Sequence, residues 1–109
     1  MLFWRKNMKI YPSYIDGVLY IRLDGELDEH NAGLARLEAD KLAERYSNAT
    51  RAIFDLKHIT FMDSTGIGFL IGRYKKFLRF GVPVYVTNAT VSTDRILQMS
   101  GVYTLMPKV

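Results

Sequence analysis

FMDSTGIGFLIGRYKK, residues 61–76, is the stretch of this 109-residue chain that decides its fold. Asp63 and Ser64 are of the residue types preferred at helix N-caps, because their oxygens accept the unpaired N–H groups of a first helical turn. Apolar residues then repeat at spacings of three and four, which is typical of an amphipathic helix. They are Ile67, Leu70, Ile71, Tyr74 and Leu78. The pattern predicts a helix that begins near Asp63 or Ser64 and ends at Gly81.

Two glycines lie in the first turn of this predicted helix, at Gly66 and Gly68. Each costs up to ~1 kcal/mol of helix stability relative to alanine. They are explained if another backbone or a partner must approach closely there. The Ser64 hydroxyl at such a bare helix start is expected to be accessible, and a phosphate placed there would meet free N–H groups and the positive end of the helix dipole.

The chain on either side of this helix alternates between strand-like and helix-like periodicity, which is typical of α/β domains. Strands are predicted at Met8–Tyr14, Val18–Leu23, Arg51–Leu56, Val82–Thr87 and Val102–Met106. Helices are predicted at Asp28–Ser47, with Ala35, Ala39, Leu42 and Tyr46 on one face, and at Thr90–Ser100. Asp16-Gly17 predicts a hairpin turn, Gly25 a break in the second strand, and Gly101 the end of the last helix. Right-handed crossovers then predict a mixed, mostly parallel sheet flanked by helices, in one domain over residues 1–109.

The composition limits the class of protein. The chain has no cysteine, which excludes a disulfide framework and a thiol nucleophile and agrees with a cytoplasmic location. No apolar run approaches the ~20 residues of a membrane span. The N-terminal charges follow the apolar residues, the wrong order for a signal peptide. Leu2, Phe3 and Trp4 are expected to form a loose terminal segment or to cover a sheet edge, with contact to a membrane surface as the alternative.

Two enzyme-like patterns around Asp63 are weak. Asp-Ser-Thr-Gly is similar to the turn of aspartic proteases, but an extra residue separates Ser64 from Gly66 and a helix follows. Gly66, Gly68 and Gly72 miss a dinucleotide fingerprint by one residue, and residues 82–87 lack the acidic residue which that fingerprint requires. The sequence therefore does not favour an enzyme, and no cofactor is expected.

The two histidines, His30 and His58, have no metal-ligand spacing, so we expect no metal site. A catalytic pair of Ser64 with His58 would lack a third, orienting group. Both histidines are expected to be surface or half-buried residues.

Two charged clusters stand out in a chain whose net charge is only +4. The acidic one comprises Asp24, Glu26, Asp28 and Glu29. It is explained either by Asp28 capping a helix or by an exposed loop that meets a basic partner. The basic one comprises Arg73, Lys75, Lys76 and Arg79, and a solvated helix face accounts for it. Nucleic-acid binding is not expected, because Tyr74 falls on the apolar stripe rather than among exposed aromatics.

Three segments together resemble the anti-anti-sigma factors of the STAS-domain family, over about Met8 to Met106. The segments are LDGELDEHNA at 23–32, RAIFDLKHITFMDSTGIGFLIGRYK at 51–75, and ILQMSGVYTLM at 96–106. The resemblance is strongest to the sporulation-type anti-sigma factor antagonists that are phosphorylated on serine. It implies a four- to five-stranded sheet and a protein that is a binding switch, not an enzyme.

The resemblance also implies partners and site residues. The unphosphorylated protein would bind an anti-sigma factor that is an ATP-dependent serine kinase, and so release a sigma factor. The kinase, which itself holds the ATP or ADP, would then phosphorylate Ser64 and break the complex, and a serine phosphatase would reverse this. The partner-binding residues carried over by motif are Glu26, Asp28, Asp63, Ser64, Thr65, Gly66 and Gly68.

The chain departs from the family pattern at its C-terminus. The family usually continues past the last strand into a final helix, which is expected to be absent here because the chain stops at Val109. The apolar surface thereby left open predicts a weak homodimer, with Phe3 and Trp4 as participants. A scaffold subunit of a larger signalling or transporter-linked assembly is the alternative function.

Overall fold

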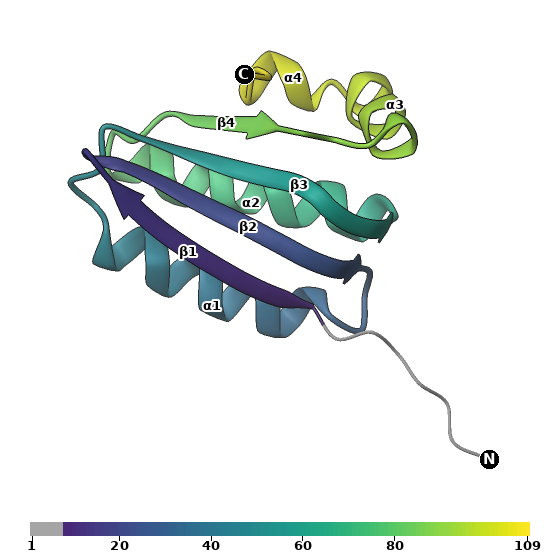
Figure 1. The fold of residues 1–109 in the computed structure, drawn as a ribbon, viewed down its shortest axis with the longest axis horizontal. Helices are drawn as coiled ribbons and strands as arrows, with labels where there is room; N and C mark the ends of the chain where they lie inside the picture. The colour runs from purple at the N-terminus through teal and green to yellow at the C-terminus, as the bar shows by residue number, and fades with distance from the viewer. Residues whose placement is uncertain (1–7) are drawn as a thin grey trace.

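A computed structural model describes residues 8–109 of the chain (Figure 1). Its elements are β1 Lys9–Ile15, β2 Val18–Leu27, α1 Ala32–Arg45, β3 Arg51–Met62, α2 Ser64–Arg79, β4 Val84–Thr87, α3 Val91–Ser100 and α4 Val102–Leu105. The four strands form one sheet in the order β1-β2-β3-β4. β1 and β2 pair antiparallel, whereas β2–β3 and β3–β4 are parallel. The predicted mixed, mostly parallel α/β sheet is confirmed.

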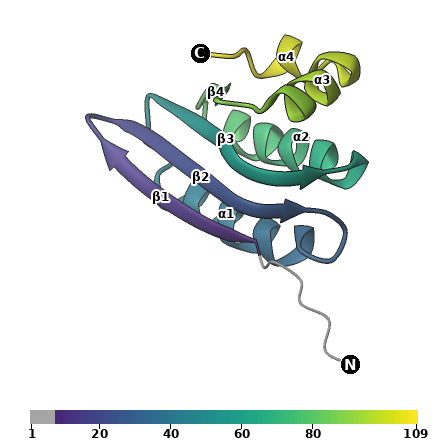
Figure 2. The ribbon, with the colours of Figure 1, turned by 45° about the vertical axis from the view of Figure 1, so that its right-hand side comes forward.

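One face of the sheet carries the core. Figures 1 and 2 show α1 and α2 against the same face, while α3 and α4 lie beside β4 at the edge of the sheet. Alternate residues of β2 point toward the helices and are fully buried, namely Leu19, Ile21, Leu23 and Leu27. On β3, Phe54 packs edge-to-face against Phe69 and Phe77 of α2. This packing holds the N-terminus of α2 at the end of β3.

The second strand is longer than its sequence predicts. Gly25 does not break β2, which continues to Leu27. The ladder with β3 shifts register between Arg22 and Asp24 and again between Gly25 and Glu26, and Gly25 has a φ of 120°, which other residues rarely adopt. Pairing with a neighbouring strand thus overrides the local signal of the glycine, which marks a β-bulge rather than a strand end.

Helix α1 begins four residues later than expected from Asp28. Its buried face consists of Ala32, Ala35, Ala39 and Ala43, whereas Leu42 and Tyr46 are only half-buried. Alanine on the inner face lets the helix backbone approach the sheet closely. The predicted stripe was therefore correct at Ala35 and Ala39 and only partly correct at its C-terminal end.

The predicted apolar stripe of α2 needs correction. Leu70 is buried as expected, and Ile67, Ile71 and Tyr74 are half-buried and pack against the core, but Leu78 is 56% exposed. The other buried residues of the helix are Gly66, Phe69, Arg73 and Phe77. The helix is rotated so that its two phenylalanines meet Phe54 of the sheet. The start of α2 directly after Asp63, the turn at Asp16-Gly17 and the stop at Gly101 are confirmed.

The prediction of a last strand at Val102–Met106 was wrong. Residues Val102–Leu105 form the short helix α4, in which the Met106 N–H donates to the Val102 carbonyl at 2.8 Å. Gly101, with a φ of 78°, joins α3 to α4. The chain then returns to the sheet, where Lys108 makes an isolated parallel bridge to Val86.

The expectations for Leu2, Phe3 and Trp4 lie outside the described residues. Within residues 8–109, no helix is long and apolar enough to cross a membrane.

Candidate functional site

The carboxyl ends of β2 and β3 form one edge of the sheet, and the predicted site residues gather there. In the parallel register, Glu26 lies beside Phe61 and Leu27 beside Met62. The acidic turn after β2 and the Asp63–Ser64 pair after β3 are therefore neighbours in space. Pairing of the strands thus brings together two motifs that are more than 30 residues apart in the sequence.

Asp63 caps helix α2. Its backbone is extended, and its Oδ1 accepts the N–H of Thr65 at 2.9 Å and that of Gly66 at 3.4 Å. Its carbonyl accepts from Gly66 and Ile67. The two sequence candidates for the cap are thereby distinguished, because Asp63 satisfies the first-turn donors and Ser64 is the first helical residue.

The Ser64 side chain is exposed, and no group among residues 8–109 hydrogen-bonds its hydroxyl. Thr65 beside it is half-buried, and its N–H points to the capping carboxylate. Of the two neighbouring hydroxyl-bearing residues at this helix start, Ser64 is therefore the more exposed. The helix dipole favours added negative charge at the same place.

Gly66 and Gly68, near the start of α2, differ in their surroundings. A Cβ on Gly66 would lie 2.5 Å from Met62 Cγ and 3.0 Å from the Leu27 carbonyl oxygen. Gly66 therefore lets α2 dock closely on the ends of β2 and β3. A Cβ on Gly68 would meet nothing within 4 Å, and the residue is exposed. Packing within residues 8–109 therefore does not require a glycine there.

Asp28 organises the acidic turn rather than capping α1. Its Oδ1 accepts the N–H groups of His30 at 3.0 Å and Asn31 at 3.1 Å. The N-cap of α1 is Asn31, whose side-chain Nδ2 donates to the Glu26 carbonyl at 2.9 Å. Asp28 and Asn31 together fix the loop that follows β2, and the half-buried Glu26 lies just before it, near the end of the strand.

The four acidic residues do not form one cluster. Asp24 lies on β2 and pairs with Arg22 at 3.0 Å. Glu29 is exposed on the loop. Of the set, Glu26 lies near the end of β2 and Asp28 on the turn that follows, at the sheet edge where α2 begins.

An apolar groove runs from Ser64 to helix α3, and sequence reasoning did not find it. Its volume is about 440 Å³, and it is lined by Asp63, Ser64, Ile67, Ile96, Met99 and Ser100. Met99 is 83% exposed, which is unusual for such a large apolar side chain. The available signal was the spacing of Ile96 and Met99, which places them on the outer side of a helix whose inner side holds Thr93 and Leu97.

The histidines stay apart from the site. His30 and His58 are both exposed, and neither has a hydrogen bond to Ser64. Among residues 8–109, no group of His, Cys, Asp and Glu is arranged to hold a metal ion.

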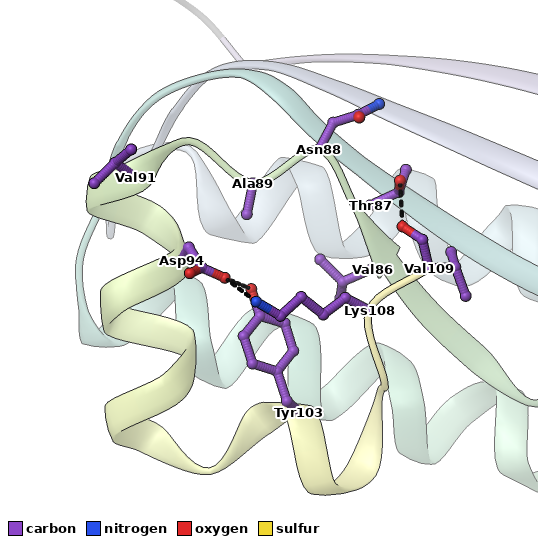
Figure 3. A pocket seen from close by; sticks show the side chains of 9 residues that line it. All are labelled: Val86, Thr87, Asn88, Ala89, Val91, Asp94, Tyr103, Lys108 and Val109. Atoms are coloured by element: carbon purple, nitrogen blue, oxygen red, sulfur yellow. Dashed lines mark hydrogen bonds and ion pairs between the residues drawn. The ribbon is translucent and has the colours of Figure 1, made fainter.

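A second pocket, of about 260 Å³, lies between β4 and α3 and is internally neutralised (Figure 3). The Tyr103 hydroxyl and the Lys108 ammonium both donate to Asp94 Oδ1. These hydrogen bonds lower the pKa of Asp94, while burial and the neighbouring carboxylate raise that of Tyr103. The groups tie α3 to the C-terminal segment, and Asp94 is paired with Lys108.

Comparison with known proteins identifies the family and the fold of the chain. Residues 11–109 match the STAS domain family. The chain is 36% identical to an anti-sigma F factor antagonist of Paenibacillus polymyxa, over 93% of this chain and 86% of that protein. Its fold is similar to SpoIIAA, an anti-sigma factor antagonist, in its unphosphorylated form, with a TM-score of 0.75, 24% identity, and coverage of 93% of this chain and 88% of that one. The phosphorylated form of SpoIIAA from Bacillus gives a TM-score of 0.68, 24% identity, and coverage of 94% and 90%.

Proposed function

This chain belongs to the STAS-domain family, and on that premise we propose that it is an anti-sigma factor antagonist controlled by phosphorylation of Ser64. The unphosphorylated protein binds an anti-sigma factor that is also a serine kinase, and the bound kinase releases its sigma factor. The identity to an anti-sigma F factor antagonist supports a sporulation-type partner and action in the cytoplasm. The chain acts by binding, and the partner kinase carries the ATP.

The observation that carries this proposal is the exposed Ser64 hydroxyl, which directly follows the capping Asp63 and has no hydrogen-bond partner within residues 8–109. A kinase needs a serine hydroxyl that is free to attack, at a position where the product phosphate is tolerated. Ser64 meets both conditions, because Asp63 already serves the first-turn N–H groups and the helix dipole stabilises an anion. Phosphorylation can therefore proceed without unfolding α2.

Phosphate at Ser64 changes the surface next to it. It brings about −1.5 to −2 charges at pH 7. Those charges lie beside Asp63 and at the same sheet edge as Glu26. A partner fitted to the uncharged serine then meets repulsion, desolvation and bulk. A loss of about 3 kcal/mol at the interface weakens binding more than 100-fold, which is enough for a switch. A serine phosphatase then removes the phosphate from Ser64 and restores binding.

The apolar groove supplies the remaining contact area. Ile67, Ile96 and Met99 give the partner an apolar surface that starts at Ser64. Glu26 adds a charge at the rim, where electrostatics governs association rate and salt dependence. Gly68 leaves room for the partner to approach the helix.

The decisive experiment incubates the protein with its anti-sigma kinase and ATP, followed by intact mass and site mapping. We expect one phosphate, on Ser64. Thr65→Ala should be phosphorylated like the parent, whereas Ser64→Ala should take no phosphate and still bind the kinase. Ser64→Asp should fold normally and bind at least ~100-fold more weakly, as the free energy above requires. Phosphate on Thr65, or parent-like binding of Ser64→Asp, would refute the mechanism.

The acidic turn needs a separate test, because Asp28 also holds the loop. Glu26→Gln removes a charge without touching the hydrogen bonds that Asp28 accepts. We expect its melting temperature to match the parent and its affinity for the kinase to fall, more so at low salt. Equal affinity at every salt concentration would remove Glu26 from the interface.

A further inference from the structure

The face of the sheet opposite α1 and α2 is open within residues 8–109. Figures 1 and 2 show both helices on the other face, while α3 and α4 lie at the edge beside β4. Because Leu19 and Ile21 of β2 are buried against the helices, Tyr20 between them points to the open face, as does Arg22. This face takes no part in the apolar groove beside Ser64.

Aromatic and aliphatic side chains form a row across the open face. The strand register places Ser13, Tyr20, Ile53 and Tyr85 side by side on the four strands, since directly paired residues share a face. Tyr20 is exposed and Tyr85 is half-buried, and they flank Ile53, which is buried although no helix described in residues 8–109 covers it. The middle of the face is therefore apolar.

Apolar surface continues on either side of this row. On one side the exposed Ile15 pairs with Val18, and on the other the exposed Tyr11 pairs with Arg22. One sheet face thus exposes three large apolar side chains, those of Tyr11, Ile15 and Tyr20. An exposed apolar surface of this extent on a small domain usually marks a place that another segment or molecule covers.

The arginines of this face already have partners. Arg22 pairs with Asp24 at 3.0 Å, and its guanidinium carbon lies 4.4 Å from the centre of the Tyr11 ring. The guanidinium carbon of Arg51 lies 5.9 Å from the centre of the Tyr85 ring. A nucleic acid binds chiefly through cations that are free to meet its phosphates, so an apolar occupant fits this face better than an anionic one.

The chain itself carries a suitable apolar segment just before β1. Leu2, Phe3 and Trp4 are consecutive large apolar residues, of types that are mostly buried in folded proteins. They lie outside the described residues, so their place follows from the sequence and from the position at which β1 begins.

The open face is within reach of this segment. Trp4 is five residues before Lys9, the first residue of β1, and five residues extend over at most ~18 Å. Along β1, Tyr11 is about 7 Å and Ser13 about 14 Å beyond Lys9, at the rise of an antiparallel strand. Ser13 pairs with Tyr20. A chain that reverses its direction before β1 therefore can lay its apolar residues over the open face.

We propose that Leu2, Phe3 and Trp4 cover the open face of the sheet in the same molecule, in contact with Tyr11 and Tyr20. Because the segment is joined to β1, its effective concentration at the face is high, and docking needs no second molecule. The segment then lies on the face opposite the helices, and the start of α2 stays free. The inference does not rest on the proposed phosphorylation, and either can fail without the other.

Trp4 is the only tryptophan of the chain, so tryptophan fluorescence reports directly on this segment. The experiment measures the emission of the full chain and its quenching by acrylamide over a wide range of protein concentrations, and again in urea. We expect emission shifted to shorter wavelength and quenching weaker than in urea, both independent of protein concentration.

Three results would overturn the proposal. Emission and quenching equal to those of the unfolded chain would show that nothing covers Trp4. Protection that grows with protein concentration would assign the cover to a second copy of the chain. Protection that appears only when phosphatidylcholine and phosphatidylglycerol vesicles are added would assign it to a membrane surface.

Two tyrosines of β1 provide a matched pair of variants. Tyr11 is 42% exposed and Tyr14 is 44% exposed, and each ring has one contact, with the Arg22 guanidinium and with the Tyr46 ring respectively. They differ in the face on which they lie, because Tyr14 pairs with Leu19, which points toward the helices. Threonine at either position keeps a high strand propensity.

Tyr11→Thr should lower the ratio of covered to uncovered Trp4 by ~10-fold, as expected from the loss of one aromatic contact. Tyr14→Thr should be quenched like the parent. Circular dichroism checks the fold of each variant, and Tyr20→Thr replaces Tyr11→Thr if the latter does not fold. Equal quenching of the open-face variant and Tyr14→Thr would overturn the proposed contact.

Discussion

Replacing Gly66 by alanine is expected to destabilise the fold, although alanine is the better helix former. The added Cβ would lie 2.5 Å from Met62 Cγ, 3.0 Å from the Leu27 carbonyl oxygen and 3.3 Å from Leu27 Cγ. Met62 is only 4% exposed, and its Cγ is not the free end of the side chain. A carbonyl oxygen in a paired strand moves less readily still. Neither the Met62 side chain nor the Leu27 backbone can therefore move away at low cost in free energy.

The change in the free energy of unfolding caused by Gly66→Ala is the sum of two opposing contributions. Exchanging glycine for alanine within a helix gains up to ~1 kcal/mol. Inserting a methyl into a filled space costs typically about 1–3 kcal/mol. At Gly66 the clash involves both backbone and a buried side chain, so we take the upper part of that range and expect a net loss of about 1–2 kcal/mol. The melting temperature should fall by roughly 4–8 °C for each kcal/mol.

Gly68→Ala is the matched control, two residues along the same helix. Within residues 8–109, no atom beyond the neighbouring residues and the backbone of the helix itself lies within 4 Å of the place that its methyl group would occupy. The gain in helix propensity should therefore appear alone, as a stabilisation of up to ~1 kcal/mol. Urea unfolding of the parent and both variants measures the two changes in the free energy of unfolding, provided that its dependence on urea concentration is the same in all three proteins. A Gly66→Ala protein as stable as Gly68→Ala would refute the close approach of α2 to β2. Any loss of kinase binding by the stabilised Gly68→Ala would reflect the interface alone.

Two further predictions concern ionised groups. Tyr103→Phe should lose less stability than the parent as the pH is raised above 10. Burial raises the pKa of Tyr103 in the folded protein, so the neutral hydroxyl contributes fully to the free energy of unfolding below its ordinary pKa of 10.0, and this contribution is lost as the pH rises above that value. The same variant should reduce the loss of stability below about pH 4. The Tyr103 hydrogen bond lowers the pKa of Asp94, and the resulting stabilisation is complete above the ordinary value of 3.8 and is lost as the pH falls below it; pH-dependent denaturation measures both effects. Asp40→Ala should destabilise by about 3 kcal/mol, because it strands the buried Arg73 charge, whereas Glu44→Ala breaks an exposed pair and should cost less than ~1 kcal/mol by urea unfolding.

Local chemistry made much of the fold predictable. The Asp16-Gly17 turn, the cap of α2 at Asp63 and the stop at Gly101 each depend on a backbone conformation or a hydrogen bond within a few residues. Such signals survive in a single sequence because the residue and its effect lie together. The placement of Ser64 at an open helix start was predictable for the same reason.

Tertiary pairing decided the features that the sequence did not reveal. Gly25 suggested a strand end, but β3 offered backbone partners that carried β2 on to Leu27. Residues Val102–Met106 have strand propensity, yet the segment follows Gly101 directly and closes a local helical turn over α2. The burial of Arg73 was hidden as well, because its charge suggested a surface position and its acidic partner lies more than 30 residues earlier in the chain.

Because Asp63 and not Ser64 caps α2, the same helix start could serve both the fold and the proposed phosphorylation. Had Ser64 been the cap, phosphorylation would remove a hydrogen bond that the fold needs, and each switching event would cost stability. Here Asp63 accepts the first-turn N–H groups, and Gly66 seats the helix on the sheet. The Ser64 hydroxyl is then free of structural duty. Under the proposed phosphorylation, the added charge would fall at the favourable end of the helix dipole, so its free-energy cost would be borne by the partner interface and not by the fold.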